Sequence, residues 1–279
     1  MKVAAIQMVS ATTLDANLAS AEALLHEAAQ AGAELAVLPE YFCLLGNRDT
    51  DKLAIQEPYG AGMIQQFLAA QARDLGLWIV GGTLPISIDG ADAGVDASGQ
   101  RVSNTSLVYS PQGRCVARYD KIHLFRFDNG TERYDESRVL QRGSEPVSFE
   151  LASRDGHTWR VGMSVCYDLR FPELYRTYAR AGADLLLVPS AFTHTTGEAH
   201  WEVLLRARAI ENQAFVVASA QGGLHENGRR TWGHSMLVDP WGRVMAQRPE
   251  GGGVVCEELS YALLKDCRVK LPALDHRVL

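Results

Sequence analysis

Residues Val161–Glu173 read VGMSVCYDLRFPE, and this stretch decides how the chain is organised. The apolar run Val161–Val165 is typical of a buried strand, and it ends abruptly at the thiol of Cys166. Pro172 then suits the first turn of a helix, because the N–H that it lacks needs no partner there. The stretch therefore predicts a strand, a tight turn that exposes Cys166, and a helix.

The same alternation of strand-like runs and helical patterns extends over the rest of the chain. Short turns at 111–113 and 239–242 imply some antiparallel pairing, while the alternation itself favours βαβ units. We therefore expect an α/β fold with mixed sheets, a single domain over residues 1–279, and an exposed loop at Gly90–Gln100. The expected strands are Val3–Met8, Leu35–Leu38, Leu77–Val80, Thr105–Tyr109, Trp159–Val165, Leu185–Val188, Phe215–Ala220 and Met236–Val238, and the expected helices are Leu14–Ala28, Met63–Leu75, Phe171–Ala181 and Trp201–Glu211.

Composition narrows the class of protein. Hydrophobic residues make up 47% of the 279 residues and charged residues 22%, which is enough for a large core. The net charge of −6 argues against a nucleic-acid partner. No apolar run approaches the roughly 20 residues that span a bilayer, and the start of the chain lacks a signal region, so we expect a cytoplasmic protein without a membrane partner. The five scattered cysteines predict neither a disulfide framework nor a metal site, and we expect no cofactor.

Three segments each place a reactive group near the end of an apolar run. Glu40 follows Leu35–Leu38 and a proline, Lys121 lies among apolar and aromatic neighbours in Tyr119–Phe125, and Cys166 ends its strand. Hydrolysis of an amide through a covalent intermediate needs a nucleophile, a base, and positive charge where the oxyanion forms. A thiol, a carboxylate and an ammonium supply these three functions.

Each residue also has a plainer interpretation. A cysteine at a strand end is usually an inert small hydrophobe, a Pro-Glu step is usually a solvated loop, and a lone lysine usually lies at the surface. Only their joint occurrence favours catalysis. The competing hypothesis is a Cys/His dyad of the protease type, in which His123 or His234 would be the base.

Leu38–Glu40, Tyr119–Phe125 and Val165–Leu174 resemble the three signature segments of the nitrilase superfamily of carbon–nitrogen hydrolases. The resemblance implies a four-layer α–β–β–α sandwich of two mixed sheets. It also implies that Glu40 is the general base and acid, that Lys121 stabilises the tetrahedral intermediate, and that Cys166 forms a thioester.

The same resemblance implies further features. It points to Glu136 as a second glutamate, with Glu132 as the alternative, and to a homodimer with Leu174–Ala181 and Trp201–Glu211 as interface candidates. The backbone N–H of Tyr167, directly after the thiol, is the expected second donor to the oxyanion.

The substrate is expected to be a small-molecule amide. The segments Pro189–Thr193, Ala199–Glu211 and Gly233–Met236 resemble the branch of the superfamily that hydrolyses deaminated glutathione to 2-oxoglutarate and cysteinylglycine. The alternatives are an ω-amidase acting on 2-oxoglutaramate, another amidase or N-carbamoyl hydrolase, and a catalytically silent binding scaffold. Arg170 is expected to bind an anionic acyl group or to be structural, and Phe192 and Thr193 to line the pocket.

Overall fold

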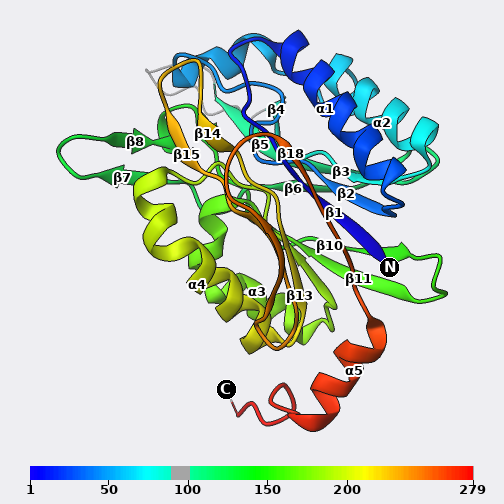
Figure 1. The fold of residues 1–279 in the computed structure, drawn as a ribbon. Helices are drawn as coiled ribbons and strands as arrows, with labels where there is room; N and C mark the ends of the chain where they lie inside the picture. Colours follow the sequence, from blue (N-terminus) through cyan, green and yellow to red (C-terminus); the bar gives the residue numbers. More distant parts are fainter. Residues whose placement is uncertain (89–100, 279) are drawn as a thin grey trace.

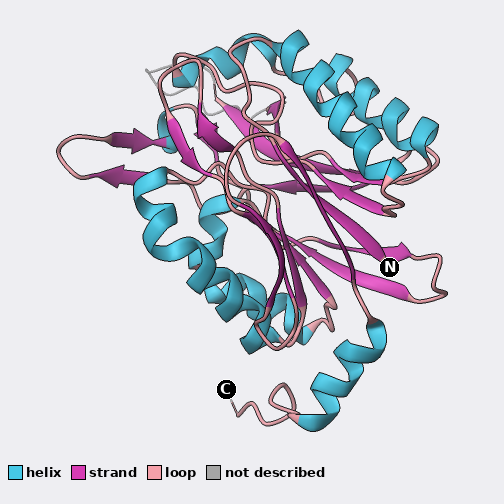
Figure 2. Ribbon diagram, viewed as in Figure 1, coloured by secondary structure: helices cyan, strands magenta, loops and turns pink. Residues whose placement is uncertain are grey.

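The structure is a computed structural model that describes residues 1–88 and 101–278. Two β-sheets pack face to face, and helices cover the outer face of each, so that four layers follow one another in the order α–β–β–α (Figures 1 and 2). Helices α1 (Leu14–Gln30) and α2 (Met63–Leu75) cover the first sheet, and α3 (Pro172–Arg180) and α4 (His194–Asn212) cover the second. The predicted α/β sandwich is confirmed.

The first sheet has parallel strands at its centre and antiparallel strands toward its edges. Strands β1, β2 and β3 are parallel neighbours, whereas β18 and β5 run antiparallel to the strands they join. The order is β18-β1-β2-β3-β5-β4, and β6 and β9 also pair with β5. The strands are β1 (Lys2–Gln7), β2 (Leu35–Val37), β3 (Trp78–Val80), β4 (Leu84–Ser87), β5 (Val102–Tyr109), β6 (Cys115–Asp120), β9 (Leu140–Gln141) and β18 (Gly253–Glu258).

The second sheet repeats this plan. Strands β11, β12 and β13 are parallel, and antiparallel strands flank them in the order β10-β11-β12-β13-β16-β17. The short turns at 111–113 and 239–242 join antiparallel neighbours, as expected. The strands are β10 (Ser148–Ala152), β11 (Thr158–Met163), β12 (Leu185–Leu187), β13 (Phe215–Ala218), β16 (Ser235–Val238) and β17 (Val244–Arg248).

Smaller elements complete the fold. Two short hairpins, β7 with β8 and β14 with β15, lie toward one end of the sandwich, and α5 extends from the other (Figure 1). Within residues 1–88 and 101–278, no helix combines the length and apolar character needed to cross a membrane. These elements are β7 (Arg126–Asp128), β8 (Arg133–Asp135), β14 (Gly222–Leu224), β15 (Arg230–Trp232), α5 (Tyr261–Lys270) and the 3-10 helices η1 (Asp49–Ile55), η3 (Glu136–Arg138) and η4 (Cys166–Arg170).

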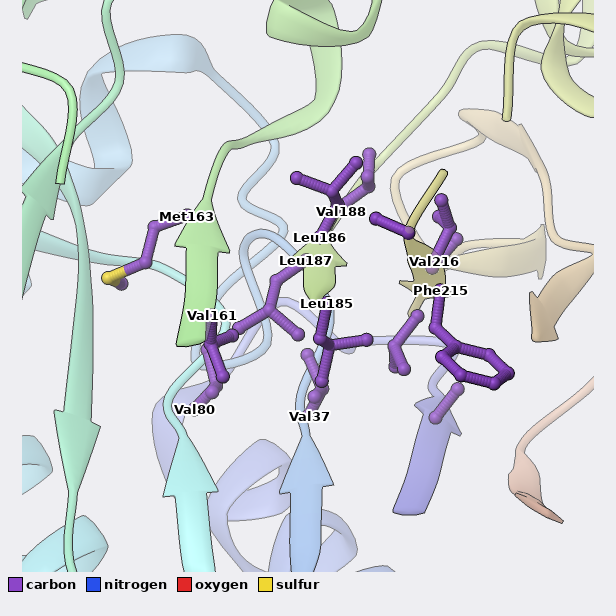
Figure 3. Close-up of a cluster of buried hydrophobic side chains, with 14 of the residues drawn as sticks. Val37, Val80, Val161, Met163, Leu185, Leu186, Leu187, Val188, Phe215 and Val216 are labelled. Carbon is purple, nitrogen blue, oxygen red and sulfur yellow. The ribbon is translucent and has the colours of Figure 1, made fainter. Parts of the chain in front are cut away.

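Burial on both faces explains the continuous apolar runs. In β2, Leu35 and Val37 point into the core between the sheets, while Ala36 packs beneath α1 and α2. Figure 3 shows Val37 beside Leu185 of the opposite sheet. Because neither face meets water, alternation between polar and apolar residues is absent from the central strands.

Most expected boundaries differ somewhat from the observed ones, and two of the differences lie near the strand end and the helix that follow the thiol. Strand β11 ends at Met163, because the Ser164 hydroxyl already bonds to the Leu187 carbonyl as the chain enters the turn. Helix α4 begins at His194, well before Trp201. Polar residues hide the apolar period of its first turns, in which Thr196 and Gly197 are the buried positions. The loop expected at Gly90–Gln100 lies outside the described residues.

Candidate active site

Three strand ends bring the predicted reactive groups together. Glu40 follows β2 of the first sheet, Lys121 directly follows β6, and Cys166 follows β11 of the second sheet. Lys121 Nζ lies 2.9 Å from Glu40 Oε1. Cys166 lines the same pocket as Glu40, and the Glu40 carboxylate acts on its thiol. The three groups therefore converge in one cleft, as expected.

Glu40 is held rigidly by neighbours from both sheets. Its Oε1 accepts hydrogen bonds from Lys121 Nζ and from Asn104 Nδ2, both at 2.9 Å. Its Oε2 accepts one from the backbone N–H of Ala191, also at 2.9 Å. The carboxylate is 1% exposed, so water does not compete for it. Since Oε2 receives fewer donors, it is the oxygen best able to take a proton from the thiol.

Lys121 links Glu40 to a second carboxylate. Its Nζ lies 2.9 and 2.7 Å from the two carboxylate oxygens of Glu136, which also accept hydrogen bonds from the Tyr41 hydroxyl at 2.8 Å and the Phe125 N–H at 2.7 Å. An ammonium has three protons. One can bond to Glu40 and one can be shared by the two oxygens of Glu136, so that the third is left for a substrate oxygen. The alternative Glu132 instead accepts from the exposed Thr195 hydroxyl.

The turn at Cys166 is strained. Its φ of 50° lies in the left-handed region, which side chains other than glycine rarely adopt, and such a residue costs on the order of 1–3 kcal/mol. The Cys166 N–H donates to the Pro189 carbonyl at 2.9 Å. Buried Asp168 accepts from the Val165 N–H at 2.8 Å, the Tyr119 hydroxyl at 2.7 Å and the His123 N–H at 3.0 Å. These bonds fix the turn to the lysine-bearing segment.

The protonation states follow from burial and charge. Burial raises the pKa of the Cys166 thiol well above its usual value, and the Glu40 carboxylate adds to that rise. Lys121 acts in the opposite direction but is outweighed, so the pKa of the thiol is not lowered as an ammonium alone would lower it. Burial by itself would lower the pKa of Lys121, yet Glu136 and Glu40 hold that pKa well above its usual value. The resting site pairs a neutral thiol with a charged lysine.

Two pockets meet at the thiol. The Arg170 pocket is lined by Phe125, Cys166, Tyr167, Arg170, Ala191, Phe192, Thr193 and Thr196. The Lys52–Arg229 pocket shares Cys166, Phe125, Ala191 and Thr193 with it. Its other lining residues are Glu40, Tyr41, Asp49, Lys52, Tyr134, Asp135, Glu136, Val139 and Arg229. All three expected substrate-binding residues, Arg170, Phe192 and Thr193, thus line the cleft.

The Arg170 guanidinium lies over the rings of Tyr167 and Phe192, at 5.7 and 5.3 Å from their centroids. One of its nitrogens is 3.2 Å from His200 Nδ1. The Tyr167 N–H makes no hydrogen bond to any other described residue, so this donor is free for a substrate oxygen.

The histidines of the competing hypothesis lie elsewhere. His123 Nδ1 is 2.7 Å from Asp168 Oδ1, and its ring stacks on Phe171 at 3.7 Å between centroids. His234 stacks on Trp232 and bonds to Gln247. Neither histidine hydrogen-bonds to Cys166 in the part of the chain that the structure describes. Over the same residues, no group of three or more His, Cys, Asp or Glu side chains could hold a metal ion.

Sequence reasoning missed several residues of the cleft. Tyr41 directly follows Glu40, and Asp168 lies two residues after Cys166, so the sequence segments themselves contain both residues. Asn104 lies in β5 between Ser103 and Thr105, so its polarity does not distinguish it from its neighbours. Lys52 and Arg229 come from η1 and from the turn between β14 and β15, and no local pattern marks them.

The chain is similar to a known protein family and to named proteins over nearly its whole length. The carbon-nitrogen hydrolase family matches residues 2–269. A protein from Synechocystis named deaminated glutathione amidase is 41% identical over 99% of this chain and 97% of its own length. The human protein of the same name is 39% identical over 99% of this chain and 81% of its own.

Several solved structures have folds similar to that of this chain. The NitFhit protein of C. elegans has a TM-score of 0.84 at 35% identity, covering 99% of this chain and 65% of that one. Nit3 of Saccharomyces cerevisiae, a member of the nitrilase superfamily, has a TM-score of 0.83 at 29% identity, covering 100% and 97%. A mutant amidase from Nesterenkonia sp. AN1, with acrylamide added at its active-site cysteine, has a TM-score of 0.76 at 26% identity, covering 98% of both chains.

Proposed function

The chain belongs to the carbon–nitrogen hydrolase family, and on that premise we propose that it cleaves the amide of deaminated glutathione, releasing 2-oxoglutarate and cysteinylglycine. The proposed nucleophile is Cys166, with Glu40 as general base and acid and Lys121 as the oxyanion donor. Glu136 positions and charges Lys121. The observation that carries the proposal is that the thiol lines one pocket with Glu40 and Glu136, which Lys121 joins through buried contacts.

Acylation begins with a neutral thiol. Because the pKa of Cys166 is raised, attack and deprotonation occur together: the sulfur bonds to the amide carbon while Glu40 Oε2 takes the proton. The carbonyl oxygen becomes an oxyanion, which accepts from Lys121 Nζ and from the Tyr167 N–H. Each such donor lowers the barrier by about 3 kcal/mol. Glu40 then gives its proton to the leaving nitrogen, the C–N bond breaks, and a thioester remains on Cys166.

Deacylation reuses the same groups. Water enters where the amine has left, Glu40 takes a proton from it, and the hydroxide adds to the thioester carbon. The second oxyanion is held by the same two donors. It collapses to a carboxylic acid, the C–S bond breaks, and the Cys166 sulfur regains its proton from Glu40.

Kinetics can distinguish deaminated glutathione from 2-oxoglutaramate as the substrate. Deaminated glutathione and 2-oxoglutaramate share one acyl group and therefore one thioester, so discrimination arises before or during acylation. We expect a higher kcat/KM for deaminated glutathione, by roughly tenfold or more, because its leaving group can make a charge-assisted hydrogen bond that ammonia cannot.

Side-by-side kinetics on deaminated glutathione, 2-oxoglutaramate, an N-carbamoyl amino acid and a simple nitrile test this. A clear preference for 2-oxoglutaramate would assign the chain to the ω-amidases and leave the mechanism intact. Absence of hydrolysis of every compound, with unreactive Cys166, would favour the silent binding scaffold.

Three further features belong to the same proposal. Residues 1–279 form a single hydrolase domain in the cytoplasm, and the protein is a homodimer through α3 and α4. Support for the dimer comes from α4, where Val203 and Ile210 are 68% and 49% exposed. Sedimentation of the wild type and of a Val203→Glu variant tests this assembly, because a buried charge at the interface would favour the monomer.

A further inference from the structure

The Lys52–Arg229 pocket holds two cations that form no close ion pair with a described carboxylate. Within residues 1–88 and 101–278, neither Lys52 nor Arg229 has a carboxylate oxygen within ion-pair distance, although Asp49 lines the same pocket. Asp135, which also lines it, is occupied by the N–H and hydroxyl of Ser137. The pocket therefore contains free cationic donors beside the thiol.

Aromatic rings hold both cations in place. Lys52 Nζ lies 4.5 Å from the centroid of the Tyr41 ring, and the Arg229 guanidinium lies 5.2 Å from that of Tyr134. A ring face orients a cation without using its N–H donors. Lys52 can thus give its donors to a ligand. Arg229 also interacts with the Tyr134 hydroxyl but has five N–H donors, and a guanidinium pairs with a carboxylate through two parallel bonds.

The two cations are also close enough to repel each other. Burial is the main reason that the pKa of Lys52 is lowered. The charges of Glu136, Asp49 and Glu40 act against it, and the charge of Arg229 lowers the pKa further. Like charges brought together in a partly buried pocket are unfavourable unless an anion lies between them. An anionic group bound beside both side chains would relieve this repulsion.

The position of Glu40 decides which part of a substrate would occupy this pocket. Glu40 must reach the leaving nitrogen to protonate it, and Glu40 lines the Lys52–Arg229 pocket but not the Arg170 pocket. The leaving amine therefore extends toward Lys52 and Arg229, while the acyl group extends toward Arg170. A cation on each side of Cys166 fits an amide with a carboxylate at each end.

We infer that Lys52 and Arg229 bind the carboxylate of the leaving group, and so select amides whose amine half ends in an acid. This inference rests on the proposed function at Cys166. It assigns to two residues the discrimination between a dipeptide leaving group and ammonia.

The test compares deaminated glutathione with its analogue in which the terminal glycine carboxylate is a carboxamide. Acyl group and leaving group are otherwise the same, so the ratio of the two kcat/KM values reports only the carboxylate. We expect the wild type to favour the acid roughly tenfold or more. In Arg229→Gln and Lys52→Gln, the ratio should fall toward one. The matched control is Arg230→Gln, an exposed neighbour paired with Glu250, which should keep the wild-type ratio.

Arg170→Gln separates the two sides of the cleft. It should lower kcat/KM for both substrates alike and leave their ratio as in the wild type. A wild-type ratio near one overturns the inference but not the proposed function, since both substrates are still hydrolysed. A ratio that collapses in Arg170→Gln and persists in Arg229→Gln overturns it as well. If neither substrate nor 2-oxoglutaramate is hydrolysed, the proposed function is wrong, and the inference is wrong with it.

Discussion

Replacing Glu136 by glutamine tests how the site keeps Lys121 charged and in place. The Glu136 carboxylate accepts from three groups: Lys121 Nζ, which lies within hydrogen-bond distance of both oxygens, the Tyr41 hydroxyl and the Phe125 N–H. A glutamine has one acceptor oxygen and one donor nitrogen. Its oxygen must face the Phe125 N–H, which cannot reorient. Its nitrogen then faces the tyrosine hydroxyl, which can rotate to accept, and one bond from Lys121 is lost.

The lost bond is charge-assisted, so Glu136→Gln should cost about 1.5–3 kcal/mol in transition-state stabilisation, which is roughly a 10- to 100-fold lower kcat/KM. The pH profile should change too. Glu136 is the strongest of the charges that raise the pKa of Lys121, so its loss lowers that pKa. Because the oxyanion needs the protonated amine, activity should disappear on the alkaline side at a lower pH than in the wild type.

The same substitution should reduce stability near neutral pH. The pKa of Lys121 is raised in the folded protein, so its charge stabilises the fold below the unfolded pKa, and this is lost as pH rises through the folded value. The pKa of Glu136 is lowered, so its contribution is present above the unfolded pKa and is lost as pH falls. Steady-state rates from pH 6 to 10 and urea unfolding at pH 7.5 measure both effects. The reasoning would be refuted if the alkaline limb of the variant's pH profile coincided with that of the wild type and its kcat/KM stayed within twofold of the wild-type value.

Three further outcomes follow from the same geometry. Cys166→Ala should abolish turnover while the far-UV spectrum is retained, and wild type mixed with substrate should show an acyl adduct by intact mass; substantial activity in the variant would exclude Cys166 as nucleophile. Alkylation of Cys166 by iodoacetamide should accelerate with pH and show no plateau below about pH 9, because burial raises its pKa above the usual value near 8.5; a plateau near neutrality would contradict the neutral thiol. Asp168→Asn should leave one backbone N–H of the turn unpaired and cost about 1–3 kcal/mol in urea unfolding, with kcat lowered in parallel; unchanged stability would mean that the turn does not depend on these bonds.

Much of the fold was predictable because its central strands are short and wholly apolar. The runs at Leu35–Leu38 and Leu185–Val188 identify strands buried on both faces, and α2 has the same bounds in sequence and structure. The edge strands escaped prediction. Strand β6 carries charged and exposed residues because its pairing with β5 is set by the backbone, so its side chains need not follow an apolar pattern.

By itself, the sequence determined the reactive groups. A carboxylate after Leu38-Pro39, a lysine in Tyr119–Phe125 and a thiol at a strand end are local features, because chemistry at a strand terminus depends on a few adjacent residues. The tertiary structure decided everything that depends on neighbours distant in the sequence. Burial in the folded protein raises the pKa of Cys166, whereas the expected ammonium alone would have lowered it. In the folded protein Glu136, one of the two candidate glutamates, contacts Lys121. The tertiary structure also brought Lys52 and Arg229 to one pocket from segments far apart in the chain, since burial and charge depend on distances that only the folded backbone sets.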